Sequence, residues 1–215
     1  NDPRYLGRIV GIGRTREGNN AALYRLSSQT FPHRQLQESQ LTVKVVPEEG
    51  YEHQLDGDRN IFYNAIVTTS RFVIVGNGSH TDFIAEAIDN DLPPQKAIET
   101  VFASLGYERN DEKTPRIVGV VPGQGEFGWL AIVREDALIV RRLALEEGKC
   151  IYVATREVMD PGSVGCVLSR LSAMELAEDL IKQEPFCNFS NAIAASAALC
   201  RYPNVQIASY FPERS

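Results

Sequence analysis

Residues 72–106 read FVIVGNGSHTDFIAEAIDNDLPPQKAIETVFASLG and set the plan of the fold. The β-branched and aromatic run from Phe72 to Gly76 predicts a strand. A first helix is expected from about Thr81 or Asp82 to Ile88, and a second from Pro94 to Gly106, after a turn rich in Asp and Asn. Apolar residues in the second helix follow the i, i+3, i+4, i+7 spacing of one buried face: Ile98, Val101, Phe102 and Leu105.

Two β-rich blocks flank this helical pair. Segments rich in Val, Ile, Thr and aromatic residues predict strands before it at 5–14, 21–28, 41–47 and 61–69. Similar segments predict strands after it at 116–121, 128–134, 137–145 and 149–155. A capping box of Ser172 and Glu175 predicts a helix that reaches about Lys182. An Ala-rich segment predicts another helix over 190–200, and a closing strand is expected over 205–210.

This order of elements predicts an α+β fold. Two mainly antiparallel sheets stacked face to face, with helices outside, would bury every apolar face that the pattern creates. The chain has 215 residues and shows neither repeats nor a linker, so we expect one domain over 1–215. The alternating strand–helix rhythm of a doubly wound fold is absent.

Composition narrows the class of protein. The sequence has no apolar run long enough to cross a bilayer, so we expect a cytoplasmic protein with no membrane contact. The net charge of −6 disfavours general binding to nucleic acid. The four cysteines form no CxxC pair and the chain has three histidines, so we predict no metal site and reduced cysteines in the core: Cys150, Cys166, Cys187 and Cys200.

Positive charge is concentrated at the N-terminal end. Residues 1–34 carry six arginines and two acidic residues. Arg25 and Arg34 flank a Ser/Thr-rich bend that includes Ser27 and Ser28, and guanidinium groups with hydroxyl donors suit a phosphate. Surface ion pairs or an ordinary strand end explain the same pattern equally well.

A polar loop, Gly76 to Asp82, joins the expected strand to the first helix. Its small residues let backbone approach a ligand, and the helix start offers free N–H groups. A turn with a cap from Ser79 or Thr81 is the alternative reading. The loop is neither a Walker motif nor a dinucleotide-binding motif. Two further pairs, Tyr63-Asn64 and Tyr107-Glu108, are individually typical of a core residue and a solvated acid.

Together these segments resemble the archaeal-type IMP cyclohydrolase family. They keep the order of the family's motifs across residues 5–117: Tyr5-Leu-Gly-Arg8-Ile9, Tyr24-Arg25-x-Ser27-Ser28, Phe31-Pro32-x-Arg34, Tyr63-Asn64, Asn77-Gly-Ser-His-Thr-Asp82, Tyr107-Glu108 and Thr114-Pro-Arg-Ile117. The resemblance implies a four-layer αββα sandwich like that of N-terminal-nucleophile hydrolases, used without an N-terminal nucleophile.

The resemblance also implies a reaction, the last step of de novo purine biosynthesis. 5-Formamidoimidazole-4-carboxamide ribotide closes to IMP and water, without cofactor or metal. The implied catalytic residues are Arg34, Tyr63 and Glu108. Contacts to the purine ribonucleotide are implied for Arg25, Ser27, Ser28, Asn64, Asn77, Gly78, Ser79, His80, Asp82 and Arg116. Members of the family tend to assemble, so we expect a homo-oligomer.

Two segments, 56–59 and 159–166, depart from the family's pattern. If they line the cleft, the substrate has changed while the chemistry has stayed. Two alternatives are therefore kept: a diverged enzyme that closes a ring or acts on an amide of another nucleotide-like substrate, and a non-catalytic purine-nucleotide-binding protein. Fold resemblance alone does not choose between them.

Overall fold

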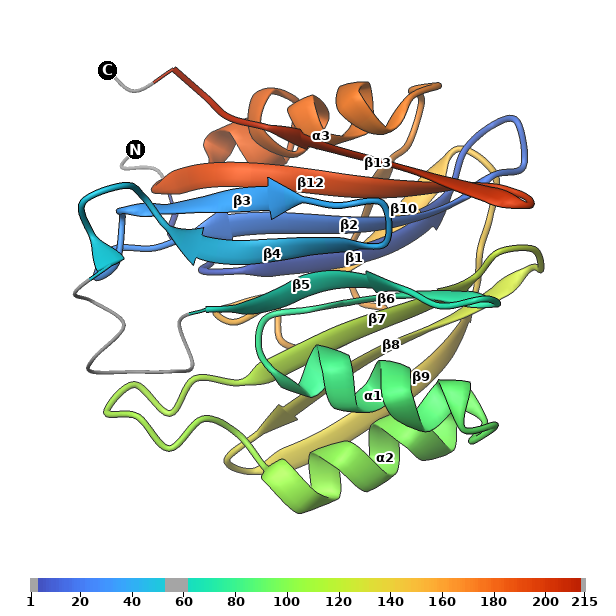
Figure 1. The fold of residues 1–215 in the computed structure, drawn as a ribbon, viewed down its shortest axis with the longest axis horizontal. Coiled ribbons are helices and arrows are strands. Elements are labelled where there is room, and N and C mark those ends of the chain that lie inside the picture. The colour runs from blue at the N-terminus through green and yellow to red at the C-terminus, as the bar shows by residue number, and fades with distance from the viewer. Residues whose placement is uncertain (1–3, 53–61, 214–215) are drawn as a thin grey trace.

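The computed structural model describes residues 4–52 and 62–213 as two antiparallel sheets and three α-helices (Figure 1). The six-stranded sheet has the order β11-β10-β1-β2-β12-β13. Its strands are β1 Ile9–Arg14, β2 Asn20–Ser27, β10 Lys149–Ala154, β11 Gly165–Val167, β12 Ala192–Arg201 and β13 Asn204–Tyr210.

The second sheet has seven strands in the order β3-β4-β5-β6-β7-β8-β9. They are β3 Arg34–Glu38, β4 Thr42–Pro47, β5 Tyr63–Thr68, β6 Phe72–Gly76, β7 Arg116–Pro122, β8 Phe127–Arg134 and β9 Ala137–Ala144. The helices are α1 His80–Asp89, α2 Pro94–Leu105 and α3 Ala173–Lys182, with a short 3-10 helix at Phe186–Asn188.

Three apolar clusters hold these elements in layers. Strand β2 shows how: Tyr24 and Leu26 face the cluster between the two sheets, whereas Leu23 faces the cluster under α3. Alternate residues of a strand point to opposite faces, so one strand serves both clusters. On the far side, Ile84 of α1 and Phe102 of α2 pack on the outer face of the seven-stranded sheet. The sheets therefore lie between α3 on one side and α1 and α2 on the other (Figure 1).

The predicted α+β class, two antiparallel sheets and outer helices are confirmed, but the predicted helix over 190–200 is wrong. Those residues form β12, which pairs with β2 and β13. Ala194 and Ala198 face the cluster between the sheets, and Ala195 and Ala197 face α3. In a strand that is buried on both faces, apolar and polar residues do not alternate in the sequence. The Ala-rich segment was therefore mistaken for a helix. The strands β3 and β11 were not predicted.

The prediction of reduced cysteines is also corrected. Cys150 and Cys166 form a disulfide between β10 and β11, where they are register partners with Cα atoms 5.1 Å apart. The sequence prediction missed it because β11 was not recognised. Cys187 is exposed and Cys200 is buried, and both are free. Burial of Cys150 and Cys200 agrees with the prediction that they belong to the core.

Segment 56–59, which departs from the family's pattern, lies outside the described residues. Within residues 4–52 and 62–213, no helix is long and apolar enough to cross a membrane.

Close approach of the sheets yields a test of the packing. A Cβ at Gly119 of β7 would lie 2.7 Å from Ile12 Cγ2 and 3.1 Å from Val75 Cγ1, so Gly119→Ala requires these packed side chains or their strands to shift. We expect the free energy of unfolding in urea to fall by about 1–3 kcal/mol. Gly123→Ala is the matched control, because its added Cβ has no neighbour closer than 3.7 Å. Equal stability of the two variants would contradict this packing.

Candidate active site

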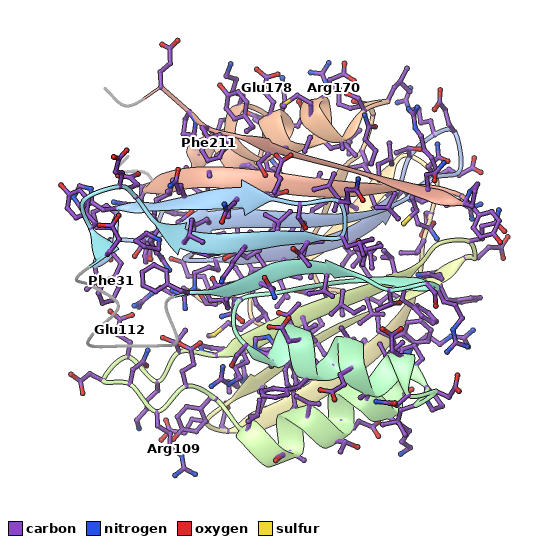
Figure 2. All side chains as sticks on the ribbon, in the orientation of Figure 1. Phe31, Arg109, Glu112, Arg170, Glu178 and Phe211 are labelled. Atoms are coloured by element: carbon purple, nitrogen blue, oxygen red, sulfur yellow. A yellow bond between two sulfur atoms is a disulfide. The ribbon has the colours of Figure 1, made fainter. Side chains whose placement is uncertain are left out.

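A cavity of about 260 Å³ lies at one end of the sandwich. The segment before β1, the bend between β2 and β3, the start of β5 and the loop before β7 form its walls. Phe31 and Glu112, from two of these walls, are labelled on the same side of the molecule in Figure 2. Its lining residues are Tyr5, Arg8, Ser28, Thr30, Phe31, Arg34, Tyr63, Glu108, Asn110, Asp111, Glu112 and Thr114.

The three predicted catalytic residues all line this cavity. Arg34 begins β3, Tyr63 begins β5, and Glu108 lies in the loop after α2. The side chains come from parts of the chain that are far apart in sequence, and each residue is 5% exposed or less. A larger groove of about 770 Å³ lies by the β5–β6 turn and the β12–β13 hairpin, but no predicted site residue lines it.

Glu108 lies between two guanidinium groups. Its Oε2 is 3.9 Å from Arg8 and its Oε1 is 3.6 Å from Arg116. The backbone N–H of Glu108 donates to Thr114 O at 2.9 Å, and Arg116 Nε donates to Gly106 O at 3.1 Å. The carboxylate is therefore held at the cavity wall by charge on both sides and by its own loop.

Tyr63 has a hydroxyl partner from the opposite sheet. The oxygens of Tyr24 and Tyr63 are 2.5 Å apart, and Arg8 and Arg34 are the charged groups that face this pair. Arg34 Nε donates to Phe31 O at 3.1 Å, which ties the arginine to the bend. Burial lowers the pKa of Arg34. Burial is also the largest single influence on Arg8 and lowers its pKa, but Tyr63, Glu108, Tyr24 and Tyr5 together outweigh burial, so the pKa of Arg8 is raised.

The predicted phosphate residues are divided between the two faces of β2. Ser28 lines the cavity, and its Oγ accepts from Phe31 N at 2.9 Å. Arg25 points the other way, where its NH2 group donates to Phe189 O at 2.7 Å. Ser27 is fully buried, and neither it nor Arg25 lines the cavity. Burial lowers the pKa of Arg25 to about 10, so Arg25 stays charged at neutral pH.

The polar loop before α1 bonds mainly to the protein itself, and none of it lines the cavity. Asn77 donates to Pro115 O at 3.0 Å and accepts from Ile117 N at 2.8 Å. His80 Nε2 donates to Ile117 O at 2.9 Å. These bonds join the loop to the strand that carries Arg116.

Close packing around Arg116 explains the small residue at position 78. A Cβ at Gly78 would lie 3.1 Å both from Arg116 NH1 and from His80 Nδ1. Ser79 is half-buried, and its side chain does not cap α1. Beside the loop, Asn64 Nδ2 donates to Asp82 Oδ1 at 2.8 Å. The loop thus supports Arg116, which in turn lies beside Glu108.

Sequence reasoning missed several lining residues. Arg8 is the most important of them, because it lies near both Glu108 and Tyr63. Two features of the sequence could have identified Arg8: it belongs to one of the family's motifs, and it lies in the arginine-rich N-terminal stretch. Asp111 and Glu112 carried no such signal, since a loop acid at a cavity looks like any solvated acid in sequence. Within the described ranges there is no group of three or more His, Cys, Asp or Glu side chains that could hold a metal ion.

His80 provides a test through acid stability. Burial lowers the pKa of His80 to about 3, against the hydrogen bond to Ile117 and with the help of Arg116. Because the folded-state pKa lies below the unfolded value, this stability is complete above about pH 6.5 and is lost as the pH falls toward 3.

Between pH 7 and 5, we expect His80 to account for about 2 kcal/mol of lost unfolding free energy. Urea unfolding at both pH values should show a loss smaller by that amount in His80→Gln than in the unmodified chain. Equal losses in both proteins would show that His80 is not held neutral.

A family model described as "IMP cyclohydrolase-like protein" matches residues 5–202. A protein of Methanosphaera stadtmanae named IMP cyclohydrolase is 32% identical over 90% of this chain and 93% of its own length. IMP cyclohydrolase of Thermococcus kodakarensis is 36% identical over 83% of this chain and 86% of its own. IMP cyclohydrolase of Methanothrix thermoacetophila is 32% identical over 97% of this chain and 99% of its own length. The chain, as its motifs predicted, therefore belongs to the IMP cyclohydrolase-like family.

Proposed function

We propose that this chain is an IMP cyclohydrolase, a hydrolase-class enzyme that closes 5-formamidoimidazole-4-carboxamide ribotide to IMP and water. The observation that carries the proposal is the meeting of Arg34, Tyr63 and Glu108 in one cavity, in a member of this family. A donor, an acid–base group and a cation are the groups that this ring closure needs.

The chemistry begins with a weak nucleophile. An amide nitrogen attacks a formyl carbon only when the site orients the two groups. The site must also remove the proton from the nitrogen during the attack and polarise the formyl carbonyl. Glu108 is proposed to take the proton from the carboxamide nitrogen. Arg34 and Tyr63 polarise the formyl oxygen, and Tyr63 gives it a proton as the C–N bond forms. The product of this step is a neutral carbinolamine.

Loss of water uses the same groups a second time. The proton on Glu108 returns to the Tyr63 oxygen, which restores both groups. Tyr63 then protonates the carbinolamine hydroxyl as its C–O bond breaks, and Glu108 removes the proton from the neighbouring ring nitrogen. A second return of the proton regenerates the site, so one water molecule leaves and no other reactant is consumed.

Phosphate binding is proposed at the bend between β2 and β3. Ser28 lines the cavity there beside Thr30 and Arg34. Arg25 lies on the other face of β2, and its Nε and NH1 atoms have no hydrogen-bond partner in the described part of the chain. A buried guanidinium without a carboxylate partner favours an anion nearby. We propose that the positive charge of Arg25 acts on the phosphate from beneath the bend, where the neutral hydroxyl of Ser27 is also buried.

The polar loop is proposed to act by support. Asn77 and His80 bond to the strand that carries Arg116, and Gly78 leaves room for the Arg116 side chain. Arg116 in turn pairs with Glu108. Contacts of Asn64, Ser79 and Asp82 with the nucleotide stay a prediction.

We further propose a single domain over 1–215 with the architecture of N-terminal-nucleophile hydrolases. A homo-oligomer in the cytoplasm stays a prediction, and light scattering of the purified protein tests the assembly.

The decisive assay mixes purified protein with the formamido ribotide in EDTA and follows IMP by absorbance. Turnover in the chelator supports a cyclohydrolase that needs no metal. Tight IMP binding without turnover would favour the nucleotide-binding alternative. Turnover of another nucleotide-like amide alone would favour the diverged enzyme.

Glu108→Gln tests the acid–base role. The amide keeps the size of the side chain but cannot accept the proton, so turnover should fall by about 10²-fold or more while IMP affinity changes little. Glu135→Gln is the matched control and should leave turnover unchanged, because Glu135 forms a solvent-exposed ion pair with Lys113 and lies outside the cavity. Unchanged turnover in Glu108→Gln would remove this residue from the mechanism.

Arg25→Ala tests the phosphate proposal. Loss of the buried charge beneath the bend should weaken IMP binding by about tenfold and leave inosine binding nearly unchanged. Calorimetric titration with both ligands makes the comparison, and Arg25→Lys, which keeps the charge, should retain part of the affinity. An equal loss for inosine would show that Arg25 acts only by holding Phe189 and the segment around it.

A further inference from the structure

Two tyrosine hydroxyl groups meet at the inner end of the cavity. Tyr63 lines the cavity, whereas Tyr24 is fully buried behind it and lies outside the lining. Their oxygen atoms are 2.5 Å apart. Tyr24 therefore reaches the site only through Tyr63.

The direction of this hydrogen bond follows from the surroundings of Tyr24. Each phenol hydroxyl has one proton to donate. In the part of the chain that the structure describes, Tyr63 is the one hydrogen-bond partner of Tyr24. The charged groups facing Tyr24 are Arg34 and Arg8, which donate hydrogen bonds and do not accept them. A buried O–H without an acceptor is costly, so Tyr24 donates to the Tyr63 oxygen.

This direction leaves the proton of Tyr63 for the cavity. We infer that Tyr24 is a positioning residue: its hydrogen bond to Tyr63 turns the Tyr63 proton toward the substrate oxygen and so makes Tyr63 the acid of the ring closure. The inference rests on the proposed function, and it gives a physical reason why Tyr63 acts as the acid there.

The same hydrogen bond serves the proton transfer itself. When the O–H bond of Tyr63 breaks and a new O–H bond forms on the substrate, the electron pair stays on the Tyr63 oxygen. That phenolate accepts the hydrogen bond from Tyr24 and faces the positive charges of Arg8 and Arg34. Glu108, whose Oε2 lies 3.9 Å from Arg8, returns the proton.

Tyr24 itself does not supply the transferred proton. Burial, followed by the neighbouring Tyr63, raises the pKa of Tyr24 well above its ordinary value, and Arg34 and Arg8 only partly oppose this shift. Tyr24 therefore remains a donor across the pH range of the assay.

Tyr24→Phe tests the inference, because it removes one oxygen atom and keeps the ring in the core. We expect kcat to fall about tenfold, the effect of losing one hydrogen bond of ordinary strength, with IMP affinity unchanged. The alkaline limb of the kcat profile should move to higher pH, since the Tyr63 phenolate loses a donor. Tyr152→Phe is the control: Tyr152 is a buried tyrosine of the same sheet on its outer face, so neither quantity should change.

A double-mutant cycle asks whether Tyr24 acts through Tyr63. In a Tyr63→Phe background, Tyr24→Phe should cost almost nothing further, because the group that it orients is already gone. An equal loss of kcat in both backgrounds, or an alkaline limb that does not move, would overturn the inference and leave Tyr24 a purely structural residue.

Failure of the inference and failure of the proposed function give different results. If the unmodified protein forms no IMP, the proposed function is overturned, and this role of Tyr24 with it. If it forms IMP and Tyr24→Phe matches Tyr152→Phe, only the role of Tyr24 is overturned.

Should Tyr24→Phe not fold, 3-fluorotyrosine at position 24 keeps the hydroxyl and the packing. Its more acidic phenol should move the alkaline limb, which reports the coupled pair, to lower pH. An unmoved limb would again overturn the inference.

Discussion

One hydrogen bond between the sheets governs the geometry of the site. Tyr24 belongs to β2 of the six-stranded sheet and Tyr63 to β5 of the seven-stranded sheet, and their hydroxyl groups meet at 2.5 Å. Both tyrosine rings belong to the apolar cluster that joins the sheets. Packing of that cluster therefore sets the distance between the hydroxyl groups, and a shift of one sheet would break the contact and move Tyr63 in the cavity.

The charges around this contact explain why the cavity can be both buried and polar. Arg8 and Arg34 face the same tyrosine pair, and two like charges in a low dielectric repel each other. Glu108 offsets part of this charge from its place between Arg8 and Arg116. The loop before α1 secures Arg116 through the strand bonds of Asn77, so residues that never line the cavity still control its charge.

Much of this could be predicted from sequence, and the failures have physical causes. The motifs identified Arg34, Tyr63 and Glu108, which the structure brings together, because such residue types in that order are rare. The motif around Asn77 gave no means of telling a ligand loop from a scaffold, since a side-chain amide bonds equally well to substrate or to backbone. Arg25 was assigned to the nucleotide from its motif, and the motif does not show that alternation along β2 turns this side chain to the face opposite the cavity. Recognising that required the register, and a one-residue change of register reverses every side chain.

The division of arginines between the two faces of β2 has a consequence for how a nucleotide would lie. A phosphate group binds to any accessible guanidinium group. If the arginines at the inner end of the cavity had no carboxylate beside them, the phosphate would bind there in place of the reacting groups. Glu108 counters this: a carboxylate beside Arg8 repels a dianion but accepts a hydrogen from a neutral amide. Arg25 forms no ion pair with a carboxylate in the described ranges, and burial lowers its pKa to about 10. Under the proposed function, Arg8 and Arg116, which pair with Glu108, would face the neutral reacting groups, and Arg25 would face the phosphate.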